Sequence, residues 1–284
     1  MPIAMAPAQG FYINLDRSPQ RRRAVEAEIA RAGLAGRYRR FPGIDGAMLP
    51  AGRYAVTPGE AGCFLSHLGA IEAGAASGRP VHVLEDDALL CRGFARHLAM
   101  IVDRVLDHFD IVFTDMLLPG NPEFTRDCLA YYRDHRSTGA FNVFAGTYWA
   151  CMASYVVHPG AAGKLAGLLR QEEQAGMRQP VDLYLARLVK DGSITAGCLF
   201  PFVTSVHFPY PGMARDKDVA RTTIHRPRET VAERLIVDLP RAAFYIDIDL
   251  KRLRSGLAAL APVPEALRAD FRNCAALLDA MPAR

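Results

Sequence analysis

The first forty residues have the apolar and polar pattern of a strand followed by a helix. Residues 10–15 (GFYINL) form a short aromatic and β-branched run, which predicts a buried strand. Ser18 then suits the N-cap of a helix, and Pro19 suits its first position. Val25 and Ile29 lie one turn apart and predict the buried face of that helix. The chain therefore opens with a strand, a turn and a helix.

A second helix leads into a strongly apolar strand. Thr57 and Glu60 have the spacing of a capping box, and the apolar positions after them repeat at helical intervals as far as Gly78. Residues 81–84 (VHVL) predict a buried strand. Three consecutive acidic residues, 85–87, follow this strand at once, and apolar residues follow them.

Strands and helices keep alternating through most of the chain, whereas residues 119–140 lack a clear period and predict a surface loop. The alternation favours an α/β fold: a single Rossmann-type domain with a mostly parallel mixed sheet flanked by helices. Basic helices follow residue 229, so we expect the α/β domain over 1–228 and a mostly helical extension over 229–284. The further segments are helices near 94–106, 160–169 and 180–189, and strands near 111–114, 142–157, 194–196 and 202–206.

Composition and charge exclude several classes of protein. The 284 residues are 50% apolar and 23% charged, which excludes a disordered chain and allows a large core. The net charge is +4, but residues 1–40 carry +5 and the other 244 carry −1. A nucleic-acid binder would spread its positive charge along a surface, so we expect no nucleic-acid partner. The local excess instead allows an anion site near the N-terminus.

The six cysteines indicate reduced thiols in a reducing compartment. None pairs as CxxC, no Cys/His cluster has zinc spacing, and most lie among apolar neighbours. The first residues have neither the charge nor the apolar run of a signal peptide, and no apolar stretch reaches the roughly 18 residues of a membrane span. We therefore expect a cytoplasmic protein.

The acidic triplet Glu85-Asp86-Asp87 is the most informative feature. Ligands of open α/β sheets bind beyond the carboxyl ends of strands, which is where this triplet should lie. Adjacent carboxylates need positive charge, and oxygen ligands without cysteine or spaced histidine favour Mg²⁺ or Mn²⁺ together with a phosphate. A solvated loop or a helix N-cap is the alternative interpretation. The chain contains neither a P-loop nor a GxGxxG motif after a strand, so metal and arginine would have to hold the phosphate.

Arginines at positions 21–23 fit that requirement. They fall in the first turns of the predicted helix, where the helix dipole disfavours cations by about 0.3–1 kcal/mol each. A bound anion nearby would explain their position, although each could also lie on a solvated helix face.

Several segments, in order, resemble glycosyltransferase family 25, which includes lipopolysaccharide, lipooligosaccharide and collagen galactosyltransferases. The resemblance implies a GT-A fold and a metal-dependent, inverting transfer of a sugar, galactose-like, from a nucleoside-diphosphate donor, UDP-linked, to a hydroxyl of a glycan such as lipopolysaccharide. The region after 200 matches the family less well. The matching segments are FYINLDRSPQRR (11–22), FPGIDG (41–46), GEAGCFLSHLGAIE (59–72), VHVLEDDALL (81–90), TYWACMASYVVHPGAAGKL (147–165) and PVDLYL (180–185).

The resemblance also implies roles for individual residues. The triplet matches the family's Asp-x-Asp-like site for Mn²⁺ or Mg²⁺. We assign Asp87 and Glu85 as ligands, and Asp86 to the ribose or to organising the site. A late histidine, His207, is a further candidate ligand, because some GT-A enzymes use one there.

Inversion needs a carboxylate that takes the acceptor proton. Asp182, at a helix start, and Asp115, at a strand end, are the two candidates, although Asp182 also suits the first turn of a helix for purely structural reasons. We expect nucleotide contacts from Asp16, Arg17 and Arg22, since the first strand–helix turn is the usual place for them.

Other functions fit parts of the same pattern. A non-catalytic relative that binds a nucleotide sugar or a glycan would keep the triplet but lack the base. A metal-dependent phosphohydrolase could use the same carboxylates, but the chain lacks the extra His/Asp clusters of a two-metal site. Basic residues at 251–254, before a Leu/Ala-rich helix, allow peripheral contact with the inner face of an anionic membrane, with a C-terminal cap helix as the alternative.

Overall fold

The computed structural model describes residues 8–118, 122–148, 150–206, 239–258, 265 and 268–281. Within them a seven-stranded sheet has the order β2-β1-β3-β7-β5-β8-β6, and β4 and β9 form a separate pair. Five strands run in one direction and β6 and β7 run against it, which confirms the α/β class with a mostly parallel mixed sheet. The strands are β1 (Gln9–Asn14), β2 (Tyr38–Pro42), β3 (Val81–Glu85), β4 (Ala88–Leu90), β5 (Ile111–Phe113), β6 (Asn142–Ala145), β7 (Ser154–Val157), β8 (Ala196–Phe200) and β9 (Thr204–Val206).

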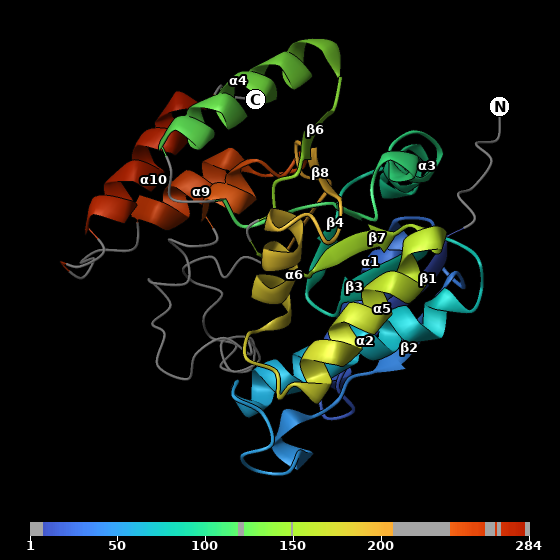
Figure 1. The fold of residues 1–284 in the computed structure, drawn as a ribbon. Helices are drawn as coiled ribbons and strands as arrows, with labels where there is room; N and C mark the ends of the chain where they lie inside the picture. The colour runs from blue at the N-terminus through green and yellow to red at the C-terminus, as the bar shows by residue number, and fades with distance from the viewer. Residues whose placement is uncertain are drawn as a thin grey trace.

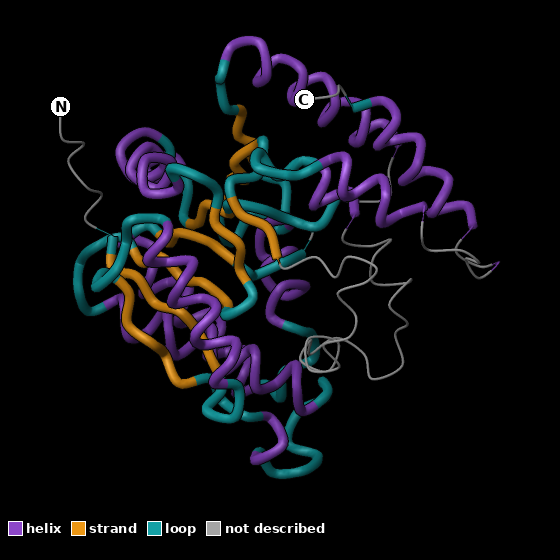
Figure 2. Tube along the Cα trace, turned by 180° about the vertical axis from the view of Figure 1, so that it is seen from behind, coloured by secondary structure: helices purple, strands orange, loops and turns teal. Residues whose placement is uncertain are grey.

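Helix α2 lies on the sheet, whereas α4, α9 and α10 form a separate group (Figure 1). Helices α2 and α5 pack side by side, and α1 packs against β1 and β4. Figure 2 shows the strands as a twisted layer among these helices. No helix in the described ranges is long and apolar enough to cross a membrane. The helices are α1 (Pro19–Arg31), α2 (Pro58–Ala75), α3 (Phe94–Arg104), α4 (Pro122–Thr138), α5 (Pro159–Gln174), α6 (Val181–Lys190), α9 (Leu250–Ala258) and α10 (Arg268–Ala280), with short 3₁₀ turns η1 (Gly46–Met48) and η2 (Leu106–His108).

The first two helices form where the sequence places them. The Thr57 side chain accepts a hydrogen bond from the Glu60 amide, and the Glu60 side chain accepts one from the Thr57 amide, so the predicted capping box is present. Val25 and Ile29 are buried on α1, as the apolar spacing predicts. Local sequence therefore defines the two helices that lie beside the acidic triplet.

The prediction of a surface loop over residues 119–140 is wrong. The helix α4 occupies most of this segment, and Cys128 and Tyr132, four residues apart, are its fully covered side chains. The ring of Tyr132 packs edge-on against Phe244, with 5.8 Å between the ring centroids. The apolar stripe of α4 is narrow and its partner lies far along the chain, which is why the helical period is hard to see among the polar residues.

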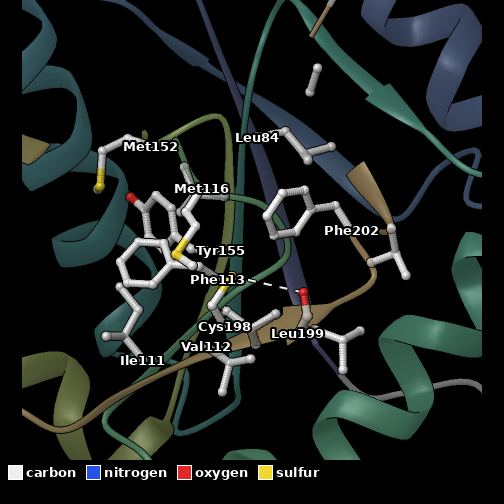
Figure 3. Packing of buried hydrophobic residues seen from close by; sticks show 14 of the residues in the cluster. Leu84, Ile111, Val112, Phe113, Met116, Met152, Tyr155, Cys198, Leu199 and Phe202 are labelled. Carbon is white, nitrogen blue, oxygen red and sulfur yellow. Dashed lines mark hydrogen bonds between the residues drawn. The ribbon is translucent and has the colours of Figure 1, made fainter. Parts of the chain in front are cut away.

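The core lies between β3, β5, β7 and β8 and the helices that cover them. Figure 3 shows side chains from these strands, among them Leu84, Phe113 and Tyr155, packed together with Phe202. Phe113 also stacks on Tyr148 at a centroid distance of 3.8 Å. The acidic triplet therefore follows a strand, β3, that is buried in this core.

The C-terminal part of the chain joins this core. The amide of Phe202 donates to the carbonyl of Phe244, and the amide of Ile246 donates to the carbonyl of Phe202, both at 3.0 Å. The expected boundary between 1–228 and 229–284 lies outside the described residues, so this division stays a prediction. Helices α4, α9 and α10 lie together (Figure 1), and Arg254 and Arg133 donate to carbonyls at the end of α10.

One edge of the sheet collects the polar side chains. Strands β1, β3 and β5 run in the same direction and end at this edge with Asn14, Glu85 and, two residues beyond β5, Asp115. Strand β7 runs against them and begins there. The carboxyl ends of the parallel strands therefore meet where an α/β sheet usually binds its ligand.

Candidate active site

The acidic triplet lies at the carboxyl end of β3, as predicted. Glu85 is the last residue of that strand, and Ala88 begins the short strand β4, so the triplet forms the turn between them. Asp86 is buried, whereas Glu85 and Asp87 are half-buried. Charges held so close together in a covered position require compensation.

Arg21 supplies part of that compensation from the first turn of α1. Its guanidinium contacts Asp86 and lies 3.1 Å from Oδ2 of Asp87. The cation at the positive end of a helix is thus balanced by the protein's own carboxylates. The other two arginines of the run differ, because Arg22 pairs with Glu26 at 2.9 Å and Arg23 is exposed. Two of the three arginines at positions 21–23 are therefore neutralised by carboxylates of the protein itself.

Asn14 fixes the orientation of Asp86. Its Nδ2 donates to Oδ2 of Asp86 at 2.6 Å, and its Oδ1 accepts from Nε of Arg40 at 3.2 Å. Burial raises the pKa of Asp86 to about 6, the charge of Arg21 opposes this shift, and the charge of Asp87 adds to it. Asp86 is therefore held in place by Asn14 at the end of β1 and by Arg21 on α1.

Asp87 has the property expected of a ligand for a hard cation. Its Oδ1 is buried and has no hydrogen-bond partner among the residues that the structure describes. A buried carboxylate oxygen without a donor is costly unless a cation satisfies it, and oxygen ligands are those that Mg²⁺ and Mn²⁺ take. The residues present therefore fit a divalent cation at Asp87. Glu85, two positions earlier in the sequence, is the second acidic residue of the turn that is half-buried.

Glu85 contacts α2 through a histidine. Its Oε1 lies 3.0 Å from Nε2 of His67, and the other ring nitrogen of His67 lies 3.0 Å from the hydroxyl of Tyr155. His67 is buried, and both of its ring nitrogens have a partner. Burial raises the pKa of Tyr155 well above its ordinary value, so its hydroxyl stays protonated.

Cys63 completes this group one turn before His67 on α2. Its Sγ lies 3.9 Å from Oε1 of Glu85. Burial, together with the charges of Glu85 and Asp182, raises the pKa of Cys63 well above its ordinary value. The C-x₃-H spacing alone does not indicate this cluster, because the third member comes from another element.

A cleft opens beside these residues, between the end of β1, the start of α1 and the segment 43–46 of the FPGIDG motif. That segment packs backbone to backbone on α2: a Cβ on Gly46 would lie 1.6 Å from the carbonyl oxygen of Pro58, and one on Gly62 would lie 2.4 Å from that of Ile44. The lining residues include Asn14, Arg17, Ser18, Arg21, Asp45, Cys63, Ser66, His67, Glu85 and Asp86.

The two candidate bases lie in different environments. Asp115 is fully buried, and Nε of Arg241 donates to its Oδ2 at 2.9 Å. Asp182 is half-buried in the first turn of α6, where its Oδ1 accepts from the amide of Leu183 at 2.8 Å. The charge of Asp182 also adds to the raised pKa of Tyr148, which is mainly due to burial, and Asp182 is not among the described residues that line the cleft.

The structure brings only some of the residues expected to contact the nucleotide to the cleft. Arg17 lines the cleft and its Nε donates to Asp45 at 2.6 Å. Asp16 is 84% exposed and pairs with Arg40, whereas Arg22 pairs with Glu26 and does not line this cleft. His207 lies outside the described residues.

The sequence does not single out Asn14 and Arg241, and it does not identify the partners of Arg21. Arg21 could be recognised only as one member of an arginine run, because its partners are 65 and 66 positions later. Arg241 lies in a region without a recognisable motif, and Asn14 looked like an ordinary strand position. A polar residue at the end of an apolar strand was the available signal for Asn14.

A mostly parallel α/β sheet with acidic residues and a cleft at the carboxyl ends of its strands is typical of proteins that bind a small ligand at this edge. The chain belongs to glycosyltransferase family 25, described as lipopolysaccharide biosynthesis proteins, whose model matches residues 8–185. The protein is therefore a glycosyltransferase, and the family resemblance seen in the motifs is confirmed. The match ends within α6, so β8, β9, the late histidine and the C-terminal helices lie beyond it.

Comparison with individual proteins adds little to this family assignment. No curated protein matches the sequence. Two crystal structures of LgtC are similar over 92% of this chain and 99% of theirs at 12% identity. One is an active-site mutant, with a TM-score of 0.34, and the other is the galactosyltransferase with donor and acceptor sugar analogs, with a TM-score of 0.32. The assignment therefore rests on the sequence match over residues 8–185.

Proposed function

We propose that the protein is a metal-dependent, inverting glycosyltransferase of GT-A type. It transfers a galactose-like sugar from a UDP-linked donor to a hydroxyl of a glycan such as lipopolysaccharide. The observation that carries this proposal is the buried, unpartnered Oδ1 of Asp87 within an acidic turn beside a cleft. A carboxylate left in this state suits a site completed by a cation and a diphosphate.

The donor metal is Mn²⁺ or Mg²⁺ in this proposal. Asp87 and Glu85 would hold it, and His207 stays a candidate ligand. When bound, such a cation neutralises the charge that develops on a diphosphate leaving group. Arg21, already placed against Asp86 and Asp87, adds a fixed positive charge at the same turn.

The nucleotide part of the donor would occupy the cleft beside β1 and α1. Arg17 and Asp86 line this cleft, and we propose them as contacts to the phosphates and the ribose. Asp16 and Arg22 stay candidates at its margin. The apolar side chains of Ile13 and Ile44 also line it and suit the face of a base.

Asp182 is the base in this proposal. The acceptor oxygen bonds to the anomeric carbon while the bond from that carbon to the diphosphate oxygen breaks, and its electron pair leaves with the diphosphate. Asp182 takes the proton of the acceptor hydroxyl, so the single displacement inverts the anomeric configuration. Asp182 is half-buried, so its carboxylate is open to solvent, whereas Asp115 is buried and already bound by Arg241.

We also place the enzyme in the cytoplasm, at the inner face of the membrane that holds its glycan acceptor. The six free cysteines suit a reducing compartment. Arg254 is not available for an anionic surface in the described structure, because it bonds to the carbonyls of Leu278 and Met281. Any peripheral contact would therefore depend on other basic residues.

A panel of UDP-, GDP- and CMP-sugars tests the proposal, scored by thermal shift with and without Mn²⁺ and by release of the nucleotide. We expect a UDP-sugar to raise the unfolding temperature only with Mn²⁺, and Asp87→Asn to abolish that increase. Asp103→Asn, an exposed acid on α3, is the matched control and should keep it. If no nucleotide sugar stabilises the protein in the presence of metal, the proposal is wrong. Stabilisation without sugar transfer to any glycan would favour a binding protein.

A further inference from the structure

A second group of metal-binding atoms lies beside the acidic turn. Cys63 and His67 are one turn apart on α2, and Glu85 reaches them from the end of β3. One potential ligand atom from each, a sulfur, a nitrogen and an oxygen, all lie within 4.8 Å of one another. This set differs in chemistry from the all-oxygen ligands Asp87 and Glu85, because it contains a thiol and an imidazole.

The distances within this group are close to those of a tetrahedral site. Zinc bond lengths place neighbouring ligand atoms roughly 3.3–3.6 Å apart. The nitrogen of His67 is 3.0 Å, and the sulfur of Cys63 is 3.9 Å, from the same oxygen of Glu85. The third pair, the sulfur of Cys63 and a ring nitrogen of His67, lies within 4.8 Å. Side-chain rotations of the half-buried Cys63 and Glu85 toward the buried His67 would therefore bring the three atoms to zinc spacing.

We propose that Cys63, His67 and Glu85 form a site for a thiophilic divalent cation of the Zn²⁺ type. Sulfur and imidazole ligands select such cations over Mg²⁺ and Mn²⁺. All three residues line the cleft, which gives a cation an entry path and leaves room for a fourth ligand from solvent.

The surroundings support His67 as a ligand. Its Nδ1 is held by the hydroxyl of Tyr155, which turns Nε2 toward Glu85 and Cys63. Such an outer partner fixes the ring of a metal-binding histidine and its tautomer. On binding, the Cys63 thiol releases its proton to solvent and its sulfur donates an electron pair to the cation, and Nε2 of His67 donates its lone pair.

This site shares Glu85 with the donor metal site of the proposed function, so the consequence for transfer rests on that proposal. A cation held by Cys63 and His67 would engage the Glu85 carboxylate that already faces them, and it would compete with the donor metal for that ligand. The binding itself does not depend on it, and the test below uses no nucleotide, so the two proposals can fail separately.

Cobalt titration of the intact protein tests the site, because Co²⁺ replaces Zn²⁺ and reports a bound thiolate by a charge-transfer band in the near ultraviolet. We expect one equivalent of Co²⁺ to produce this band, excess Zn²⁺ to remove it and Cys63→Ser to lack it. Cys151→Ser is the matched control, since Cys151 is the other half-buried thiol, and it should keep the band. Absence of the band in the native protein, or its persistence in Cys63→Ser, would overturn the proposal.

Alkylation of the native protein gives a second measurement that does not require Cys63→Ser to fold. We expect saturating Zn²⁺ to slow the alkylation of Cys63 at least tenfold, measured by mass spectrometry, and to leave Cys151 unaffected. The same protection should be lost in His67→Gln. Equal rates for Cys63 with and without Zn²⁺ would overturn the proposal.

Discussion

Arg241 donates to the buried carboxylate of Asp115 although 126 positions separate the two residues in the chain. The pair connects the end of β5 to the segment that follows residue 239. Both side chains are almost fully covered, with 4% and 0% of their surface exposed. The C-terminal segment is therefore electrostatically tied to the edge of the sheet that carries the candidate active site.

Removing only one member of this pair should be costly. Arg241→Met leaves a buried carboxylate without its partner and should lower the free energy of unfolding by about 3–5 kcal/mol. The double variant Arg241→Met/Asp115→Leu should recover most of this loss. Arg126→Met, which breaks the exposed pair with Glu123 on α4, is the control and should cost less than about 1 kcal/mol. Urea unfolding measures all of these values, and a small loss for Arg241→Met would show that the pair contributes little.

Asp182→Asn should separate catalysis from binding. Loss of a general base lowers kcat by about 10²–10⁴-fold and should leave the KM of the donor close to its original value. The acidic limb of the pH profile of kcat should disappear with it. Asp191→Asn removes the same negative charge at the other, exposed end of α6. It is the control and should retain activity. Normal turnover by Asp182→Asn would exclude this residue as the base.

His82 should make stability depend on pH. It is completely buried in β3, where it contacts the hydroxyl of Tyr38 and lies 3.0 Å from Oγ of Ser154. Burial lowers the pKa of His82 to about 3. In the unfolded chain His82 takes up a proton below about pH 6.5, while in the folded protein it stays neutral down to about pH 3.

The contribution of the neutral, buried His82 to the free energy of unfolding is therefore complete above pH 6.5 and is lost as the pH falls toward 3. Between pH 7 and pH 5 this one group should remove about 2 kcal/mol from the free energy of unfolding. His82→Gln should reduce that decrease, whereas His108→Gln, at an exposed position, should not. Denaturant titrations at both pH values give the comparison, and an unchanged decrease in His82→Gln contradicts the assignment.

Gly46 should tolerate no side chain. Its Cβ would lie 1.6 Å from the carbonyl oxygen of Pro58, and two backbones cannot separate without moving the cleft wall away from α2. Gly46→Ala should therefore cost about 1–3 kcal/mol and weaken the metal-dependent thermal shift by the donor. Gly163→Ala is the control: it lies in α5 with open space around it and should stabilise the helix by about 1 kcal/mol.

Local signals in the sequence were enough for most of the fold. The capping box of Thr57 and Glu60 and the spacing of Val25 and Ile29 determine helices whose partners are nearby in sequence. The triplet 85–87 lies where an apolar strand followed by acids places it. These features depend on residues only a few positions apart.

Features that depend on distant partners were not predictable. Helix α4 buries its stripe against Phe244, more than a hundred positions later, so its polar residues dominate the local pattern. The pairing of Arg21 with Asp86 and Asp87 depends on how β1 and β3 align, which no local pattern specifies. The roles of Asp182, Asp87, Glu85 and the nucleotide contacts stay predictions.

The antiparallel strand β7 has a consequence for how such an enzyme can diversify. Because β7 enters the sheet from the site edge, the residues just before it lie between the ends of β3 and β5: the carbonyl of Ala153 accepts from the amide of Glu85, and Cys151 lies 4.0 Å from Asp115. Lengthening or shortening this connection would change the groups presented beside Glu85 and Asp115 while every strand keeps its register. The edge of the sheet can thus vary through one connecting loop without any cost to the sheet itself.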